Sequence, residues 1–292
     1  MGGGRVFEAK FIGRLVFEAR TPVHVGGGRE ANVLYALRLR SRNALLIPAS
    51  TWKGSLRFLA ERLALTMQME ELERLALEKV TLSQSPREST RELLGEFEKA
   101  LKGEDAGPFR HEDVMRVLEE VGYELERLED VQGALIDYLS HHCPVGRLFG
   151  NRVRAASVRP LDTLLPLRVQ SRYGVGIDRK TGTAMEGALY RVETSLAGVE
   201  VPLVLVGEVE SRGSTPSRLL ASLLEAVAEV GLAVGGRKSA GLGLLELKRS
   251  EFHVVELERD AATRRGALLG DPFEAPAVDL EGFAKWLRGD QL

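Results

Sequence analysis

The chain has 292 residues, of which 44% are hydrophobic and 28% charged, and its formal net charge is −2. This composition is that of an ordinary soluble globular protein with enough apolar material for a core. The near-neutral charge argues against a globally basic, nonspecific nucleic-acid binder. A single cysteine, Cys143, excludes a disulfide framework and fits a reducing cytosol. Only three asparagines are present and most cations are arginine, which fits a thermophile.

The sequence offers no segment for a membrane. No apolar stretch is long enough to span a bilayer. Gly2-Gly3-Gly4 with Arg5 is neither a secretory signal nor a transit peptide. We therefore expect a cytoplasmic protein with no membrane partner.

Charge is unevenly distributed along the chain. Acidic residues dominate between Met69 and Asp137, whereas cations dominate between Arg147 and Arg191. The neutral total therefore combines an acidic part with a basic part, which is compatible with one anionic partner held on one side. The acidic part is explained equally well by a helical segment with a solvated acidic face.

The N-terminal part reads as strand. Residues 10–25 alternate between apolar and polar side chains and predict a strand pair or one long bent strand, followed by the loop Gly26-Gly27-Gly28-Arg29. The glycines leave this loop free to lie beside a ligand. His24 is a weak candidate for a general acid or base in RNA cleavage. A half-buried strand histidine bonded to the backbone is favoured, because no partner base or carboxylate lies nearby in sequence.

The next motif, residues 47–57, predicts a short strand that stops at Pro48 and a helix that starts at Thr51 with Ser50 as its N-cap. Lys53 and Arg57 are four residues apart and share one helix face. Together with the free N–H groups and positive dipole of the helix N-terminus, they favour a bound phosphate. An amphipathic helix with two exposed cations is the alternative.

Residues 58–142 have helical character and predict an insertion into the strand-rich core. A capping box at Ser85 opens one of its helices. His141-His142-Cys143 suggests zinc, but no second cysteine exists, so a helix end is favoured and no metal site is predicted. Helices are predicted over residues 69–80, 85–102, 112–121 and 131–139.

The C-terminal half returns to mixed strand and helix. Residues 174–184, rich in glycine, threonine and charge, predict an exposed hairpin tip that carries Arg179 and Lys180. A short helix from Asp279 to Arg288 ends at Gly289 and is expected to pack on the body or to dock a neighbour. Strands are predicted over 189–194, 201–209 and 244–248, and a helix over 217–230.

The glycine-rich stretch of residues 235–243 separates that helix from the last predicted strand. Its four glycines release the backbone to positive φ and allow close approach to another molecule. Successive amide groups and the side chains suit a phosphodiester, although a tight turn with solvated charges fits equally well. The residues assigned to it are Gly235, Gly236, Arg237, Lys238, Ser239, Gly241 and Gly243.

The order of these elements predicts an α+β, ferredoxin-like (RRM-like) core interrupted by the helical insertion. We expect the core in residues 1–57 and 143–260, the insertion in 58–142 and a C-terminal helical extension in 261–292. Four motifs in this order resemble the RAMP superfamily, and most nearly the backbone subunit of type III CRISPR effector complexes. The motifs are TPVHVGGG, IPASTWKGSLR, GRLFG with GIDRKTGTA, and GGRKSAGLG.

This resemblance implies subunits that stack into a filament, grip the guide RNA backbone and act in antiviral defence. Ser50, Lys53, Arg57 and the loop from Gly236 to Gly243 would face the RNA. The segment with Arg179 and Lys180 resembles the family's thumb hairpin, which inserts between guide–target segments. Guide RNA, paired target RNA and other complex subunits would be the partners.

One feature departs from catalytic members of that family, in which an aspartate after the first glycine loop cuts target RNA with a divalent metal. No aspartate lies between Gly26 and Lys53, and Asn32 cannot supply a carboxylate for Mg²⁺. The favoured hypothesis is therefore a noncatalytic RNA-binding subunit without a cofactor. The runner-up is an RNA endonuclease, either Mg²⁺-dependent or using His24 to process the guide. The third is a protein scaffold that does not bind RNA.

Overall fold

The computed structural model describes residues 7–125, 128–257, 265–267 and 269–291. The predicted boundary between the core and the C-terminal extension, at residues 260 and 261, lies outside these ranges. Within them, a six-stranded antiparallel sheet forms the centre of the molecule, in the order β11-β12-β1-β10-β6 with β13 paired to β12. Its strands are β1 (Ala9–Ala19), β6 (Val158–Pro160), β10 (Glu200–Val209), β11 (Leu232–Ala233), β12 (Leu244–Glu256) and β13 (Ala277–Val278).

The connections of this sheet are those of a ferredoxin-like fold. Helix α1 (Ala49–Ala64) lies in the chain between β1 and β6, and α8 (Thr215–Val230) lies between β10 and β12. The order β12-β1-β10-β6 therefore places the fourth, first, third and second strands of a βαββαβ unit side by side. The predicted α+β, ferredoxin-like core is confirmed.

Alternation along β1 explains why the helices cover one face of this sheet. Phe11, Leu15 and Phe17 are buried, whereas Ile12 is half-buried and Arg14 is exposed. The buried side chains meet the apolar stripe of α1, whose Trp52 ring lies 5.9 Å from that of Phe17. Helix α1 continues to Ala64, which is also fully buried. The predicted boundary between residues 57 and 58 therefore falls inside this helix.

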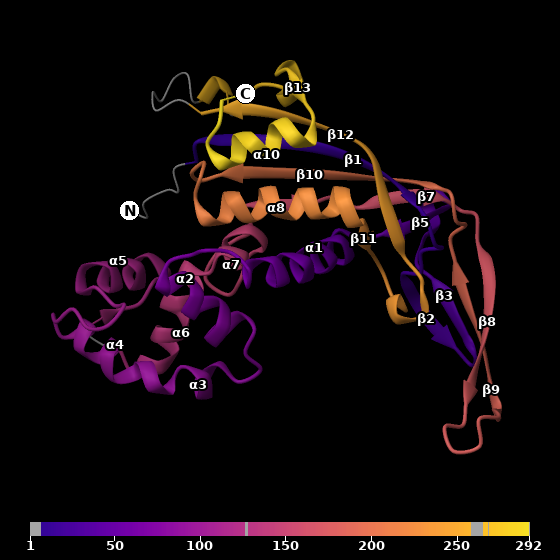
Figure 1. Cartoon of the computed structure of the whole chain (residues 1–292), viewed down its shortest axis with the longest axis horizontal. Helices are drawn as coiled ribbons and strands as arrows, with labels where there is room; N and C mark the ends of the chain where they lie inside the picture. The colour runs from indigo at the N-terminus through magenta and orange to yellow at the C-terminus, as the bar shows by residue number, and fades with distance from the viewer. Residues whose placement is uncertain (1–6, 126–127, 258–264, 268, 292) are drawn as a thin grey trace.

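Two smaller sheets extend from the central one. A four-stranded sheet has the order β2-β3-β9-β8, with β3 and β9 parallel, and a three-stranded sheet has the order β4-β5-β7. Strands β8 and β9 form a long hairpin that projects beyond both sheets (Figure 1). The strands are β2 (Gly26–Glu30), β3 (Val33–Ala36), β4 (Arg38–Leu39), β5 (Ala44–Ile47), β7 (Thr163–Pro166), β8 (Gln170–Ile177) and β9 (Ala184–Thr194).

Residues 71–142 form a helical lobe whose buried side chains belong to the same hydrophobic cluster as those of the central sheet. The rings of Phe97, Phe109 and Tyr138 meet at centroid distances between 5.3 and 5.8 Å. The helix predicted over 69–80 begins as α and continues as a π-helix, and Ser85 forms no side-chain cap. The elements are α2 (Glu71–Leu75), the π-helical η2 (Ala76–Thr81), α3 (Pro86–Ser89), α4 (Leu94–Leu101), α5 (His111–Val121) and α6 (Val131–His142), followed by α7 (Pro144–Phe149).

The C-terminal helix α10 (Leu280–Arg288) packs on the body, as one of the two predicted alternatives expects. Asp279 caps its first turn, and Gly289 ends it in a left-handed conformation. Phe283 stacks on Phe252 of β12 with a centroid distance of 4.4 Å, and both rings are fully buried.

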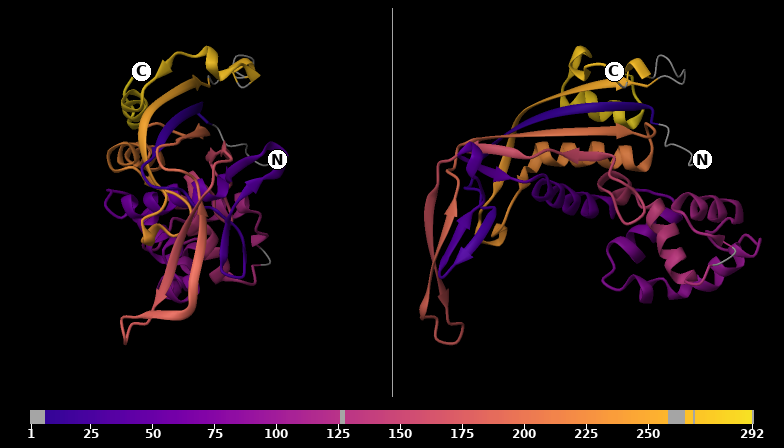
Figure 2. Two further views of the ribbon diagram at one scale, coloured as in Figure 1. Left: turned by 90° about the vertical axis from the view of Figure 1, so that its right-hand side faces the viewer. Right: turned by 180° about the vertical axis from the view of Figure 1, so that it is seen from behind.

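Together these parts form an arch. The helical lobe lies at one end and the β8–β9 hairpin at the other, with the central sheet, α1 and α8 between them (Figures 1 and 2). None of the described helices is long and apolar enough to cross a membrane. We call the concave side of the arch, between the lobe and the hairpin, the inner face.

Candidate nucleic-acid interface

The segment Pro22–Val25, which we call the junction segment, joins the central sheet to the hairpin sheet. Its backbone accepts hydrogen bonds from distant parts of the chain. The amide of Gly236 donates to the His24 carbonyl at 2.8 Å, and that of Gly243 donates to the Pro22 carbonyl at 2.9 Å. The amide of Ser195, which follows β9, donates to the Val23 carbonyl at 2.8 Å. The two glycine-rich stretches of the sequence are thereby brought side by side.

The glycine loop (residues 235–243) owes its shape to this contact. Gly235 has φ of 89°, and a Cβ there would overlap the carbonyl oxygen of His24. Arg237 adopts the left-handed region with φ of 57°, and a short 3₁₀ turn (Lys238–Ala240) follows. The first N–H groups of such a turn have no carbonyl within it to which they can donate. The loop therefore presents backbone donors and two cationic side chains together.

Arg237 connects the glycine loop to the hairpin. Its guanidinium carbon lies 4.5 Å from the centre of the Tyr190 ring on β9. Tyr190 in turn lies flat over Gly174, its partner on β8, where a Cβ would overlap the phenol ring. Gly174 is therefore required for this stack, and no local feature of the sequence indicates this role for Gly174 or Tyr190.

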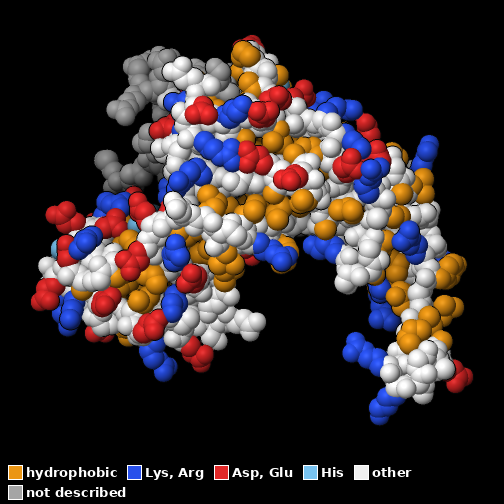
Figure 3. All heavy atoms as spheres, viewed as in Figure 1, with side chains coloured by type: hydrophobic (Ala, Val, Ile, Leu, Met, Phe, Trp, Pro, Cys, Tyr) orange, Lys and Arg blue, Asp and Glu red, His pale blue; other side chains and the backbone are white. Residues whose placement is uncertain are grey.

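Lys238 connects the same loop to α1. Its Nζ lies 6.0 Å from the centre of the Phe58 ring, and the guanidinium carbon of Arg62 lies 5.4 Å from the same centre. Ser50, Gly54 and Phe58 are exposed and spaced four residues apart, so they form one stripe along α1. The predicted loop and the predicted helix thus meet on one surface, and Figure 3 shows cationic side chains along the inner face.

The N-terminus of α1 differs from the prediction. Pro48, not Ser50, is its N-cap, with extended φ and ψ of −65° and 151°. The Ala49 amide donates to Oδ1 of Asp162 at 2.7 Å, so a carboxylate of the chain itself lies where the sequence predicts a phosphate. Proline cannot supply a capping side chain, and Asp162 comes from 113 residues away along the chain.

Arg57 is also placed differently from the expectation. Its guanidinium donates to Oε1 of Glu61 and to the carbonyl of Gly150, both at 2.8 Å. These bonds tie α1 to the end of α7. Arg57 therefore has a structural role here, whereas Ser50 is exposed and Lys53 half-buried on the same helix.

His24 is buried, with 5% of its surface exposed. Its Nδ1 lies 2.7 Å from the carbonyl oxygen of Glu193, and its ring lies against Gly236. This is the backbone-bonded strand histidine favoured by the sequence, although more deeply buried than expected. Such a position suits a residue that holds the junction segment together.

Arg179 and Lys180 are exposed at the turn of the hairpin. Oδ1 of Asp178 accepts the Lys180 amide at 2.7 Å and the Thr181 amide at 3.2 Å, which fixes the turn. Residues 174–184 therefore lie in a hairpin, as predicted. Its strands, β8 from Gln170 and β9 to Thr194, extend from this segment back toward the body. Figure 3 shows cationic side chains near the end of the hairpin, apart from those of the glycine loop.

Ion pairing separates two groups of cations. On the outer face of the central sheet, Arg249 pairs with Glu200 at 3.1 Å and Arg14 with Glu251 at 3.7 Å. The five predicted cations other than Arg57 make no ion pair within the described residues. They are Lys53, Arg179, Lys180, Arg237 and Lys238.

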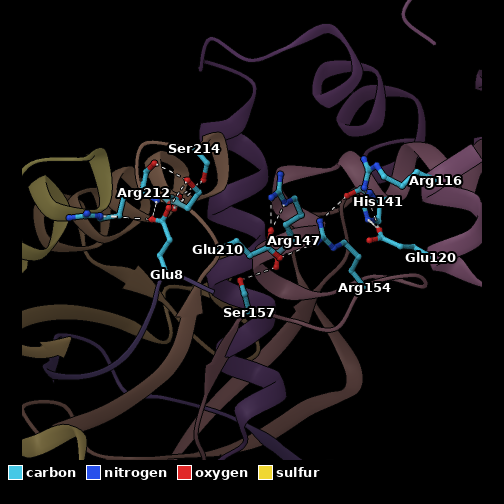
Figure 4. Close-up of polar contacts among 12 residues, drawn as sticks. Glu8, Arg116, Glu120, His141, Arg147, Arg154, Ser157, Glu210, Arg212 and Ser214 are labelled. Carbon is cyan, nitrogen blue, oxygen red and sulfur yellow. Dashed lines mark hydrogen bonds and ion pairs between the residues drawn. The ribbon is translucent and has the colours of Figure 1, made fainter. Parts of the chain in front are cut away.

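Several cations of the basic stretch 147–191 are instead used inside the protein. Arg147 and Arg154 both contact Glu210, at 2.5 and 3.0 Å, where the chain leaves β10 (Figure 4). Nearby, Nε2 of His141 lies 3.2 Å from Glu120, and burial, followed by the charge of Arg154, lowers the pKa of His141 to about 3. This network joins the helical lobe to the core, so its charges are not available to an anionic partner.

Residues 141–143, at the end of α6, include the side chains that could suggest a metal site. The Cys143 sulfur accepts the Gly146 amide at 3.3 Å and caps α7, while His142 contacts Asp113. No group of three or more His, Cys, Asp or Glu side chains that could hold a metal ion occurs among the residues described. Helix α6 ends at His142 and α7 begins at Pro144, which agrees with the helix-end interpretation of His141-His142-Cys143.

A comparison with protein-family models gives a match. A sequence model of the RAMP superfamily matches residues 16–246, which run from within β1 through the helical lobe and the glycine loop to the start of β12. A search of curated proteins returns no match.

Proposed function

Because the chain belongs to the RAMP superfamily, whose members are CRISPR-associated RNA-binding proteins, we propose that it is a guide-RNA-binding backbone subunit of a type III effector complex. One observation carries the proposal: five cations that form no ion pair with a described residue lie on α1, the glycine loop and the hairpin, and the glycine loop contacts both of the other elements. In this role the chain binds guide RNA and its paired target without cutting the target.

Phosphate binding explains this arrangement better than a scaffold role. A purely structural turn does not require two adjacent cations to meet an aromatic ring of the hairpin and one of α1, as Arg237 and Lys238 do. Exposed cations beside accessible backbone amides contact phosphates without reading base edges. The sequence of the bound RNA is then free to vary, as a guide RNA requires.

The endonuclease alternative has less support. The segment from Gly26 to Lys53 contains no aspartate. His24 is buried, and one ring nitrogen contacts a backbone carbonyl, so it is poorly placed to exchange protons with a substrate. The proposed subunit therefore holds RNA without reacting with it.

The test is a binding titration with labelled single-stranded RNAs of unrelated sequence at several salt concentrations. Replacing Arg237 by Gly and Lys238 by Ala removes two charges, and glycine accepts the left-handed φ of Arg237 without strain. This variant should bind all RNAs more weakly by a similar factor and reduce the salt slope by about 1.4, because each phosphate contact contributes about 0.7.

Arg249→Ala is the matched control, because Arg249 lies on the outer sheet and is paired with Glu200. It should leave both affinity and salt slope unchanged. If the wild-type chain fails to bind RNA, or if the loop variant binds like the control, the proposal is wrong. Cleavage of guide-paired target RNA on addition of Mg²⁺ would instead favour the endonuclease.

A further inference from the structure

Phe58 stands out on α1 because it is a large apolar side chain in an otherwise polar stripe. Its exposed fraction is 57%, and it contributes to no part of the hydrophobic core. Along the same stripe lie Ser50, Gly54 and Arg62. The next exposed apolar residue, Leu65, is separated from Phe58 by Arg62. Along this stripe of α1, Phe58 is therefore a single exposed ring flanked by Gly54 and Arg62.

The surroundings of this ring are open and cationic. A helical side chain leans toward the turn N-terminal to its own Cα, which for Phe58 is the turn of Gly54. A Cβ added to Gly54 would meet no atom within 4 Å, so this side of the ring is free. Arg62 and Lys238 approach the ring centre at 5.4 and 6.0 Å, and neither makes an ion pair with a described residue.

We propose that Phe58 is a stacking platform for one base of the bound RNA, with Arg62 and Lys238 binding the phosphates on either side. This inference rests on the proposed function. An aromatic face gains from stacking on any base, so a platform adds affinity without restricting the RNA sequence. The cations, long and flexible, leave the ring for the phosphates when the base arrives.

The first experiment compares two aromatic residues of equal exposure. Phe273, in the C-terminal part of the chain, is also 57% exposed, but its ring contacts His253 on β12. Phe58→Ala should weaken binding of single-stranded RNA about tenfold, within the range known for the loss of one stacked base. Phe273→Ala should have no effect. Circular dichroism and the unfolding midpoint show that both variants remain folded.

The second experiment tests stacking itself with an abasic oligonucleotide of equal length, which keeps the phosphates and lacks the bases. The wild-type chain should prefer RNA over this oligonucleotide, and Phe58→Ala should reduce that preference about tenfold. In Phe58→Trp, RNA should quench the tryptophan fluorescence, whereas the abasic oligonucleotide should not. The wild-type chain, with buried Trp52 and Trp286, provides the background signal.

The outcomes distinguish this inference from the proposed function. If wild-type protein binds RNA in a salt-dependent manner but Phe58→Ala keeps the same preference over the abasic oligonucleotide, the platform is wrong and the proposed function stands. The exposed ring of Phe58 would then be assigned to a contact with another protein. If the wild-type chain binds no RNA, the proposed function fails first.

Discussion

His141 is a single residue whose protonation links stability to pH. Burial and the nearby Arg154 lower its pKa to about 3, whereas in an unfolded chain a histidine titrates near 6.5. Between these values the unfolded state binds more protons than the folded state, so stability falls as the pH is lowered from 7 toward 4. The contribution of one such group reaches at most about 1.4 kcal/mol per pH unit.

His141→Gln should therefore flatten the dependence of stability on pH between 6.5 and 4. The measurement is the free energy of urea unfolding at several pH values for both proteins. At pH 7 the variant loses the contact between His141 and Glu120 and should be somewhat less stable. Parallel curves for the two proteins would show that His141 is not the group responsible.

At the scale of elements, one stack adds to the pairing of β9 with β3 in holding the β8–β9 hairpin to the body. Tyr190 lies between Gly174 and Arg237, and the glycine loop thereby fixes the hairpin at the inner face. Since an exposed cation–π contact contributes about 0.5–1 kcal/mol, losing it should increase hairpin amide exchange severalfold. Tyr190→Ala and Gly174→Ala should both show this, by removing or displacing the ring.

Hydrogen exchange of residues 170–194, followed by mass spectrometry, measures this effect. Tyr190→Phe keeps the ring and should exchange like the wild type, which makes it the matched control. Exchange in α8, on the other side of the junction segment, should be the same in all proteins. Unchanged exchange in Tyr190→Ala would mean that the backbone bonds of the hairpin sheet alone hold the hairpin in place.

The sequence predicts those elements whose signals are local. The strand predicted over 201–209 is β10, and Asp279 and Gly289 mark the two ends of α10. It fails at the start of α1, because the cap is supplied by Asp162 from a distant loop. The stack of Tyr190 on Gly174 depends in the same way on the register of two strands. Phe58 lies between Gly54 and Arg62 at helical spacing, which is a local pattern. Composition alone does not show that this pattern exposes an aromatic ring.

For the whole molecule, the division between paired and unpaired cations matters more than the net charge of −2. The sequence shows a basic stretch over 147–191, yet within it Arg147, Arg154 and Arg159 are paired with glutamates of the core. Because pairing depends on tertiary contacts, linear charge counts cannot separate structural cations from those available to a partner. Of the cations that form no ion pair with a described residue, Arg237 and Lys238 lie on the glycine loop, and Arg179 and Lys180 lie at the turn of the hairpin.

This arrangement predicts that one RNA strand contacts both the glycine loop and the hairpin tip. From Gly174, which lies under Tyr190, to Arg179 the chain extends five residues, about 17 Å for an extended strand. RNA of about 15 nucleotides can reach both sites. Replacing Arg179 and Lys180 by alanine should then reduce its salt slope by about 1.4, and combining this with the variant of Arg237 and Lys238 should reduce it by about 2.8. A hairpin variant with the wild-type salt slope would show that the tip lies outside the path of the RNA strand. If the combined variant reduces the salt slope no more than either pair alone, the two sites do not bind RNA independently.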